Sequence, residues 1–372
     1  MSLHVGMFVN YFSLVKGGAE MHAADLSAHL ERLGCRVTIV AGRSLFRGPA
    51  PARADARIIY EPCLFELKEL SRRLSPRLEW LVSSASESAY AMLARRHMGR
   101  FDVVHCHGGD TARVALASSR RRGPVVLTLH GPCTAKPRVG RLLRSVDAVV
   151  SPSEAVREIA RRDHGVEARL IPMGVDLDRF MPVDRAQARC RLGWEDRPTV
   201  CFAGRLIKVK DVPTLLRAFS LVARGKPEAR LKVAGEGVLS ESLRRYAVSL
   251  RIVDKVDFLG ALSRADLPLF YSAADVVAMP SLFENFPMVA LEALACGARL
   301  IVTHEVRAVT TRFPEVASFA AGDHETLAAL LLAGLEGRVH GVDRSKLAPH
   351  SWERIAAAHL DLYQDLTARR AA

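Results

Sequence analysis

The sequence predicts an α/β protein built from two doubly wound parallel-sheet domains. Short apolar, β-branched runs recur along the chain, and each is bounded by glycine and followed by a longer helical pattern. Strands that alternate with helices in this way indicate βαβ units and a parallel sheet covered on both faces. The alternation pauses over residues 172–197, which carry no clean period, and then begins again. A length of 372 residues suits two domains of roughly 100–200 residues each.

The first series of strands and helices predicts an N-terminal domain over residues 1–178. It opens with the run HVGMFVNYF and the helical pattern GGAEMHAADLSAHLERLG. This opening run has no basic segment before a long apolar stretch, so we interpret it as a strand and not as a signal peptide. The later members of the series are CRVTIVAG, DVVHCHG, PVVLTLHG, DAVVSPS and the helix EAVREIARRDHG.

The second series predicts a domain over residues 179–350, followed by a last amphipathic helix over about 351–368. Two such domains in tandem face a central cleft between their strand carboxyl ends, and ligands bind at such edges. The segments of this series are PTVCFAGRL, DVPTLLRAFSLVARG, ARLKVAGEG, SESLRRYAVSLRI, KVDFLG, DVVAMPS, ARLIVTH and the final SWERIAAAHLDLYQDL.

Composition and charge restrict the function classes. The formal net charge of +13 favours anionic partners such as nucleotide phosphates, nucleic acid or an anionic membrane surface. No zinc-finger spacing, RNP box or helix-turn-helix pattern is present, so we expect no nucleic-acid partner. The seven cysteines are scattered without a C-x-x-C, which indicates a reducing cytoplasm. No run approaches 18 consecutive apolar residues, so we expect no membrane-spanning helix.

Residues 64–100 form a basic, leucine-rich segment with helical character. An ordinary solvated pair of amphipathic helices explains this pattern. The alternative is a docking surface for an acceptor or for the inner face of a membrane. We therefore expect a cytoplasmic protein, with peripheral membrane contact left open.

Two glutamates in the segment ENFPMVALEALACG raise the most specific question. Glu284 follows the strand DVVAMPS, Pro287 suits the first turn of a helix, and Gly297 suits its C-terminal end. Glu292 then lies roughly 12 Å along the helix axis at 1.5 Å per residue. That separation allows one acid to bind sugar hydroxyls and the other to bind ribose hydroxyls, on either side of a phosphate at the helix start. The alternative is a capping glutamate with a second one placed by chance.

Basic residues follow the strand PTVCF in the segment AGRLIKVKD. Arg205 and Lys210 would reach one diphosphate, arginine as a bidentate fork and lysine as a point charge. An ordinary solvated loop is the alternative. We see no third ligand to join His105 and His107 in a metal site, so we predict no metal.

Further candidates follow strands of the first series. Gly17 and Gly18 would let a phosphate approach the backbone, although such a turn also needs glycine for its geometry alone. His130 ends VVLTLH and would bond a sugar hydroxyl, with a satisfied core histidine as the alternative. His105 and His107 end VVHCHG; we favour core histidines here, with a place on the acceptor side as the alternative.

These motifs together resemble the retaining glycosyltransferases of family GT4, which have the GT-B fold. The resemblance rests on GRLIKVKD, VAGEG, VDFLG, the GG turn, TLHG, IPMGVD and above all PSLFENFPMVALEALACG with its E-x7-E spacing, and it covers nearly the whole chain. It implies an N-terminal acceptor domain, a C-terminal nucleotide-sugar donor domain and a final helix that returns to the N-terminal domain.

The resemblance also implies roles for individual residues. The catalytic group would be Glu284, His130, Arg205 and Lys210: Glu284 and His130 would contact the donor sugar, and the two basic residues the leaving diphosphate. The ribose would lie on Glu292 and the base near Leu262, and Gly17 and Gly18 would close over the phosphate. Sugar or phosphate would also contact the helix start, at Phe286, Pro287, Met288 and Val289.

The resemblance implies a metal-independent enzyme with no cofactor beyond the nucleotide diphosphate sugar, because basic side chains and a helix terminus replace the divalent ion. We expect transfer of a hexose or N-acetylhexosamine, most readily from UDP, to a glycan, lipid-linked or small-molecule acceptor. Two features depart from the family pattern: Pro287 replaces a common glycine, and residues 306–308 replace a glycine-rich loop. The alternatives are a sugar-nucleotide epimerase and a non-catalytic nucleotide-sugar-binding module on the same fold.

Overall fold

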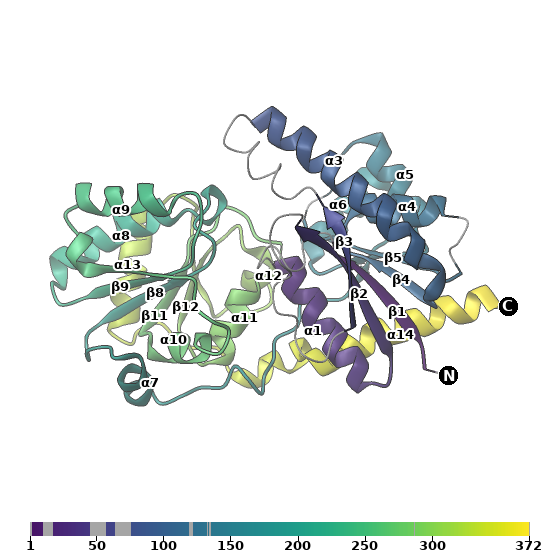
Figure 1. The fold of residues 1–372 in the computed structure, drawn as a ribbon. Coiled ribbons are helices and arrows are strands. Elements are labelled where there is room, and N and C mark those ends of the chain that lie inside the picture. Colours follow the sequence, from purple (N-terminus) through teal and green to yellow (C-terminus); the bar gives the residue numbers. More distant parts are fainter. Residues whose placement is uncertain are drawn as a thin grey trace. The chain divides into compact units, whose positions relative to one another are not determined.

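The computed structural model describes residues 2–9, 18–44, 57–63, 76–118, 122–131, 133, 135–285 and 287–371. The chain divides into two compact units (Figure 1). Unit 1 comprises Met1–Met173 with Trp352–Ala372, and unit 2 comprises Gly174–Ser351. The final helix therefore belongs to the N-terminal unit.

Unit 1 contains a seven-stranded parallel sheet in the order β3-β2-β1-β4-β5-β6-β7. Strands β1 and β4 pair in register from Val5 opposite Val103. Both faces of the sheet are covered, which explains why its central strands are continuous apolar runs. The strands are β1 (His4–Val9), β2 (Arg36–Ser44), β3 (Arg57–Cys63), β4 (Val103–Cys106), β5 (Val125–Thr128), β6 (Ala148–Ser151) and β7 (Arg169–Leu170).

Figure 1 shows α3, α4 and α5 over one face of this sheet and α1 with α14 over the other. Helix α6 shows how local sequence sets the ends of a helix. The Ser153 hydroxyl accepts a hydrogen bond from the Val156 N–H at its start, and Gly165 caps its end at φ +63°. The helices are α1 (Gly18–Arg32), α3 (Pro76–Ala94), η1 (Arg95–Arg100), α4 (Gly109–Ala117), α5 (Pro137–Ser145), α6 (Glu154–His164) and α14 (Trp352–Ala371).

Unit 2 contains a six-stranded parallel sheet in the order β10-β9-β8-β11-β12-β13. The apolar core is split between its two faces, with α10 and α11 on one side and α8, α9 and α13 on the other (Figure 1). The strands are β8 (Thr199–Ala203), β9 (Arg230–Ala234), β10 (Val256–Gly260), β11 (Val276–Met279), β12 (Leu300–Thr303) and β13 (Ala317–Phe319). The helices are α7 (Arg185–Leu192), η2 (Lys208–Lys210), α8 (Val212–Gly225), α9 (Ser240–Ser249), η3 (Val253–Lys255), α10 (Leu267–Ala273), α11 (Met288–Ala295), α12 (Arg307–Thr310), α13 (His324–Leu335) and η4 (Arg344–His350).

The predicted fold class is confirmed: each unit is a doubly wound parallel sheet. Several elements were not predicted, among them β7, β13 and α5, and two are informative. Residues 172–197 contain α7, whose N-cap Asp184 accepts from Gln187 N–H and whose C-cap is Gly193. Strand β3 was not predicted either. The predicted domain boundary after residue 178 falls within unit 2, whose first residue is Gly174. Among the described helices, none combines the length and apolar character that crossing a bilayer requires.

Candidate active site

The order of the strands in unit 2 brings Lys210 and Glu284 together. Strands β8 and β11 are parallel neighbours, so the loops that leave their carboxyl ends lie at the same edge of the sheet. The backbone N–H of Leu282 donates to the carbonyl of Val209 at 2.8 Å and ties the two loops to each other. Lys210 Nζ forms an ion pair with Glu284 Oε1, and the two side chains are only 15% and 14% exposed. The pair is therefore largely shielded from water.

Arg205 lies at the same edge, directly after β8. Its side chain is exposed, and no ion pair involves it in the described part of the chain. A guanidinium with no carboxylate partner is available to an anionic ligand. The structure thus places the two predicted diphosphate-binding residues on one short loop, with Lys210 paired to Glu284 and Arg205 without an ion-pair partner in the described ranges.

Two glycines hold the neighbouring loop against this one. A Cβ on Gly235 would lie 1.8 Å from the carbonyl oxygen of Gly204, and one on Gly237 would lie 2.3 Å from that of Leu206. Gly235 also adopts φ +138°, which side chains disfavour. The contact is closed by the N–H of Leu206 donating to the carbonyl of Glu236 at 2.8 Å. The segment GEG is therefore a structural element of the edge, packed backbone to backbone.

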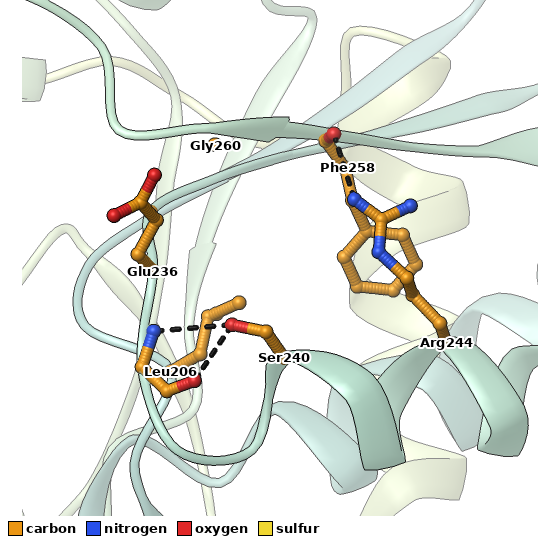
Figure 2. Close-up of a pocket in the computed structure, with 8 residues that line it drawn as sticks. Leu206, Glu236, Ser240, Arg244, Phe258 and Gly260 are labelled. Carbon is orange, nitrogen blue, oxygen red and sulfur yellow. Dashed lines mark hydrogen bonds between the residues drawn. The ribbon is translucent and has the colours of Figure 1, made fainter.

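A pocket of about 440 Å³ opens beside these loops. Figure 2 shows Glu236 on one side and Arg244 with Phe258 on the other. The Arg244 guanidinium lies 4.7 Å from the centre of the Phe258 ring and donates to the Phe258 carbonyl at 3.3 Å. A planar cation stacked on an aromatic ring offers a flat, polar-edged wall. The sequence pattern did not single out Arg244 or Phe258, because neither belongs to a motif.

Glu292 lies in the middle of α11 and is 6% exposed. The hydroxyl of Tyr271, on α10, donates to Glu292 Oε2 at 3.3 Å. Burial, followed by the charge of Glu292, raises the pKa of Tyr271 well above its ordinary value, so this hydroxyl keeps its proton and acts as a donor. A carboxylate buried in the middle of a helix needs a polar partner, and Tyr271 is one.

Helix α11 begins at Met288, with Val289 next, so both belong to the turn whose N–H groups lack intrahelical acceptors. Pro287 is the N-cap, and its carbonyl accepts from Ala290 at 3.1 Å. Gly297 follows the C-terminal end at φ +74°, as the sequence indicated. Phe286 lies outside the described residues.

The remaining donor-side candidates are scattered. Gly18 is the first residue of α1, and a Cβ there would meet nothing within 4 Å, so no described neighbour requires a glycine. Gly17 lies outside the described residues. Leu262 follows β10, is half-buried and packs against the core on the α10–α11 side. The predicted roles of these residues remain predictions.

His130 follows β5 in unit 1 and takes part in a group of histidines. Its Nε2 lies 2.8 Å from Nδ1 of His107, which follows β4. Burial lowers the pKa of His130 to about 4, so the ring is neutral at pH 7. His105 is fully buried between the Tyr363 hydroxyl and the Thr128 hydroxyl, each at 2.7 Å. The favoured interpretation of His105 as a core histidine is therefore confirmed, and the acceptor-side alternative is wrong for this residue.

Two further histidines, His22 on α1 and His359 on α14, complete this group. No sequence signal marks them, since a helical histidine at a core position looks like any amphipathic residue. Within the described ranges, no three histidine, cysteine or acidic side chains are placed so that they could hold a metal ion.

Comparison with protein families gives two matches. Residues 16–179 match the model described as Glycosyltransferase Family 4, and residues 184–316 match the model described as Glycosyl transferases group 1. The two matches meet near the boundary between the units. Every donor-side candidate after residue 184 falls in the second match.

Curated relatives are similar over most of the chain. A protein of Mycobacterium sp. (strain KMS) named D-inositol 3-phosphate glycosyltransferase is 35% identical over 77% of this chain and 70% of its own length. A relative of the same name from Frankia alni is 29% identical over 92% of this chain and 88% of its own.

Solved structures share the fold at lower identity. Sucrose-phosphate synthase from Thermosynechococcus elongatus aligns with a TM-score of 0.80 at 22% identity, covering 99% of this chain and 100% of that one. HepE of Anabaena, solved in complex with UDP and glucose, aligns with a TM-score of 0.77 at 18% identity, covering 98% and 100%. At these identities the likeness shows the fold.

Proposed function

Because the chain belongs to glycosyltransferase family 4 and has the GT-B fold, we propose that it is a retaining, metal-independent hexosyltransferase. It moves a hexose or N-acetylhexosamine from a nucleotide diphosphate sugar, most readily a UDP sugar, to an acceptor hydroxyl. The observation that carries this proposal is one edge of unit 2. The Lys210–Glu284 pair, Arg205 and the pocket lie there on adjoining loops, and Arg205 has no ion-pair partner among the residues that the structure describes.

The charges at this edge fit the parts of such a donor. Arg205 and Lys210 bind the diphosphate and stabilise the negative charge that grows on it as the glycosidic bond breaks. Glu284, already beside Lys210, accepts hydrogen bonds from hydroxyls of the sugar. Glu292 binds the ribose hydroxyls, and the donor sugar contacts His130. Two cations replace the divalent ion that other sugar-nucleotide enzymes use, so activity persists in EDTA.

The pocket beside these loops takes the nucleobase. Its wall of Arg244 stacked on Phe258 provides a flat surface for a ring, and Glu236 faces it across the opening. Phe258 and Gly260 at the end of β10 line the pocket, whereas Leu262 packs on the α10–α11 side of the core. We therefore propose Arg244 and Phe258 as the contacts of the base.

Transfer proceeds on one face of the sugar. The bond from the anomeric carbon to the diphosphate oxygen breaks while the acceptor oxygen bonds to the same face, and the leaving phosphate oxygen takes the acceptor proton. NMR of the first sugar released from an α-linked UDP-hexose, with water as surrogate acceptor, checks this. The α anomer is expected first; early formation of the β anomer, or conversion of the sugar without UDP release as in an epimerase, rejects it.

For the acceptor, the relatives named for D-inositol 3-phosphate make a phosphorylated cyclitol the first compound to test. The net charge of +13 is compatible with an anionic acceptor. Glycans and lipid-linked sugars form the second panel, and membrane contact is tested with the lipid-linked members. UDP release that depends on the added compound identifies the acceptor.

Thermal unfolding with UDP, GDP, ADP and dTDP, each in EDTA, tests the donor site directly. A ligand at 100 times its Kd adds about 2.7 kcal/mol to the free energy of unfolding. For domains of this size that raises Tm by several degrees. A shift with UDP alone supports the proposal. If none of the four nucleotides raises Tm, the proposal is contradicted. The same result also contradicts the alternative of a non-catalytic nucleotide-sugar-binding module.

A further inference from the structure

Five histidines gather in unit 1 from four separate elements. They are His22 of α1, His105 and His107 at the end of β4, His130 after β5, and His359 of α14. The ring centres of His105 and His107 lie 4.4 Å apart, and that of His22 lies 5.5 Å from His130. The two that are not fully buried, His107 and His130, are the two that bond to each other. The group thus has an inner structural part and an outer pair.

In the outer pair, one nitrogen of each ring makes the contact between the rings, and the two remaining nitrogens differ in their surroundings. Nδ1 of His107 and Nε2 of His130 lie 2.8 Å apart. The ring centres are 5.1 Å apart and the ring planes differ by 23°, so the two rings lie edge to edge, as an N–H···N hydrogen bond requires. Nε2 of His107 is buried and has no hydrogen-bond partner among the described residues. Nδ1 of His130 pairs with no described residue and is not among the buried unpartnered atoms. Only His130 therefore keeps a ring nitrogen that a ligand can reach.

A hydrogen bond between two neutral imidazoles requires that one ring donates and the other accepts. If His130 donates from Nε2, His107 must carry its proton on Nε2, where a buried N–H finds no acceptor. If His107 donates from Nδ1, the buried Nε2 is only an unused lone pair. Orphaned buried N–H groups are rare and costly, and unused acceptors less so. The second arrangement is favoured, and it requires the proton of His130 to sit on Nδ1.

We propose that His107 is a positioning residue that donates from Nδ1 to Nε2 of His130 and so holds His130 as its Nδ1–H tautomer. His130 then presents a neutral, fixed N–H donor to an oxygen of the donor sugar. The second statement rests on the proposed function, in which His130 contacts that sugar. The tautomer itself follows from the geometry of unit 1 and is independent of any substrate.

The inner histidines explain why the pair is rigid. His105, whose ring contacts His107, is fixed at both nitrogens by Tyr363 and Thr128. Carboxylates are absent from the described ring contacts and hydrogen bonds of the pair, so no acid competes for the protons. Removing His107 leaves the Nε2 of His130 without a donor, and the tautomer is then no longer fixed.

Long-range ¹H–¹⁵N NMR of the full chain, labelled with ¹⁵N-histidine at pH 7.5, reads the tautomer. Signals of His130 are assigned by their loss in His130→Gln. We expect the Nδ1–H form in the wild type and in His107→Asn, whose amide nitrogen replaces Nδ1, and a shift toward Nε2–H in His107→Ala. An Nε2–H form in the wild type, or an unchanged tautomer in His107→Ala, overturns the assignment.

The same variants then test the functional half with UDP-glucose in the absence of metal. We expect kcat for UDP release to fall roughly 10- to 100-fold in His107→Ala through misplacement of a contact group. His107→Asn should recover most of it, with KM little changed. Comparable Tm values exclude a folding defect. If the tautomer shifts in His107→Ala but kcat is unchanged, His130 does not contribute to transfer. If neither the wild type nor any variant releases UDP, the proposed function is rejected, and the tautomer result is unaffected.

Discussion

At the scale of single residues, the Lys210–Glu284 ion pair is the contact on which the candidate site depends. Both side chains are mostly buried, so removing one leaves the other charge shielded from water and without its partner. Arg205, by contrast, is exposed and unpaired among the described residues. The two cations of this loop therefore differ: Lys210 is held in position by its ion pair with Glu284, whereas Arg205 has no such partner among the described residues.

Glu284→Gln should lower turnover of the sugar nucleotide by roughly 10²–10³-fold, because a preorganised charge at the sugar is lost. Glutamine keeps the size of the side chain but releases Lys210. The matched control is Glu305→Gln, an exposed glutamate in the loop after the neighbouring strand β12. UDP release is measured for both; equal rates for the two variants reject the role of Glu284.

Sequence reasoning located these residues but not their contacts. Glu284 and Lys210 each follow an apolar run, and that placement is visible in the sequence. Their pairing depends on β8 and β11 being neighbours, and nothing in the sequence specifies that order. The same applies to Tyr271, which reaches Glu292 from a different helix, and to His22 and His359, which join the histidine group only through packing.

At the scale of elements, the edge of unit 2 is built from loops in backbone contact. Gly235 and Gly237 lie so close to the carbonyls of Gly204 and Leu206 that no side chain fits. The N–H of Gly235 also donates to the Gly260 carbonyl at 2.7 Å and links the β9 loop to the end of β10. Three successive strand ends are thereby fixed around the pocket.

Gly235→Ala should destabilise unit 2 by about 1–3 kcal/mol, since the new Cβ meets a carbonyl oxygen and φ is unfavourable. Gly225→Ala, at the end of α8 with nothing within 4 Å of the added Cβ, should be neutral or slightly stabilising. Chemical denaturation measures both. If Gly235→Ala retains wild-type stability and UDP affinity, the close loop contact is wrong.

The predicted elements and the missed ones differ in a physical way. Buried strands such as β4 and β11 are continuous apolar runs, and these were predicted correctly. Helix α7 exposes most of its residues and so shows no apolar stripe. Its signals are local ones, the capping Asp184 and Gly193, which a search for periodicity does not find. Strand β3 has the sequence RIIYEPC. Its charged residues and its proline interrupt the apolar run by which a buried strand is predicted.

At the scale of the whole molecule, the histidine group joins the last helix of the chain to the N-terminal elements of the same unit. His105 bonds to Tyr363 of α14, and His22 of α1 contacts the ring of Trp352. Burial lowers the pKa of each member of the group, to about 4 for His130 and His359 and well below the ordinary value for the others. All five are therefore neutral in the folded protein at pH 7.

Acidification should destabilise unit 1. In the unfolded chain these histidines have a pKa near 6.5, whereas burial in the folded unit lowers the pKa of His359 to about 4. The unfolded state thus binds more protons between these values, and the free energy of unfolding falls as pH drops from 7 toward 4.

Scanning calorimetry at pH 7.5, 6 and 5 measures this dependence. His359→Leu should flatten it, because one such histidine is removed, whereas the exposed His340→Gln should not. A slope that is the same in His359→Leu and the wild type contradicts the account of the group.

The most direct test of the central claim is calorimetric titration of UDP in EDTA into the wild type, Arg205→Ala, Lys210→Ala and Lys208→Ala. The account predicts metal-independent binding by the wild type and a loss of roughly tenfold or more in affinity for Arg205→Ala and Lys210→Ala, about 1.4 kcal/mol or more. Lys208→Ala, an exposed lysine on the same loop, should bind like the wild type. Equal affinities for all four proteins would contradict the assignment of this edge as the diphosphate site.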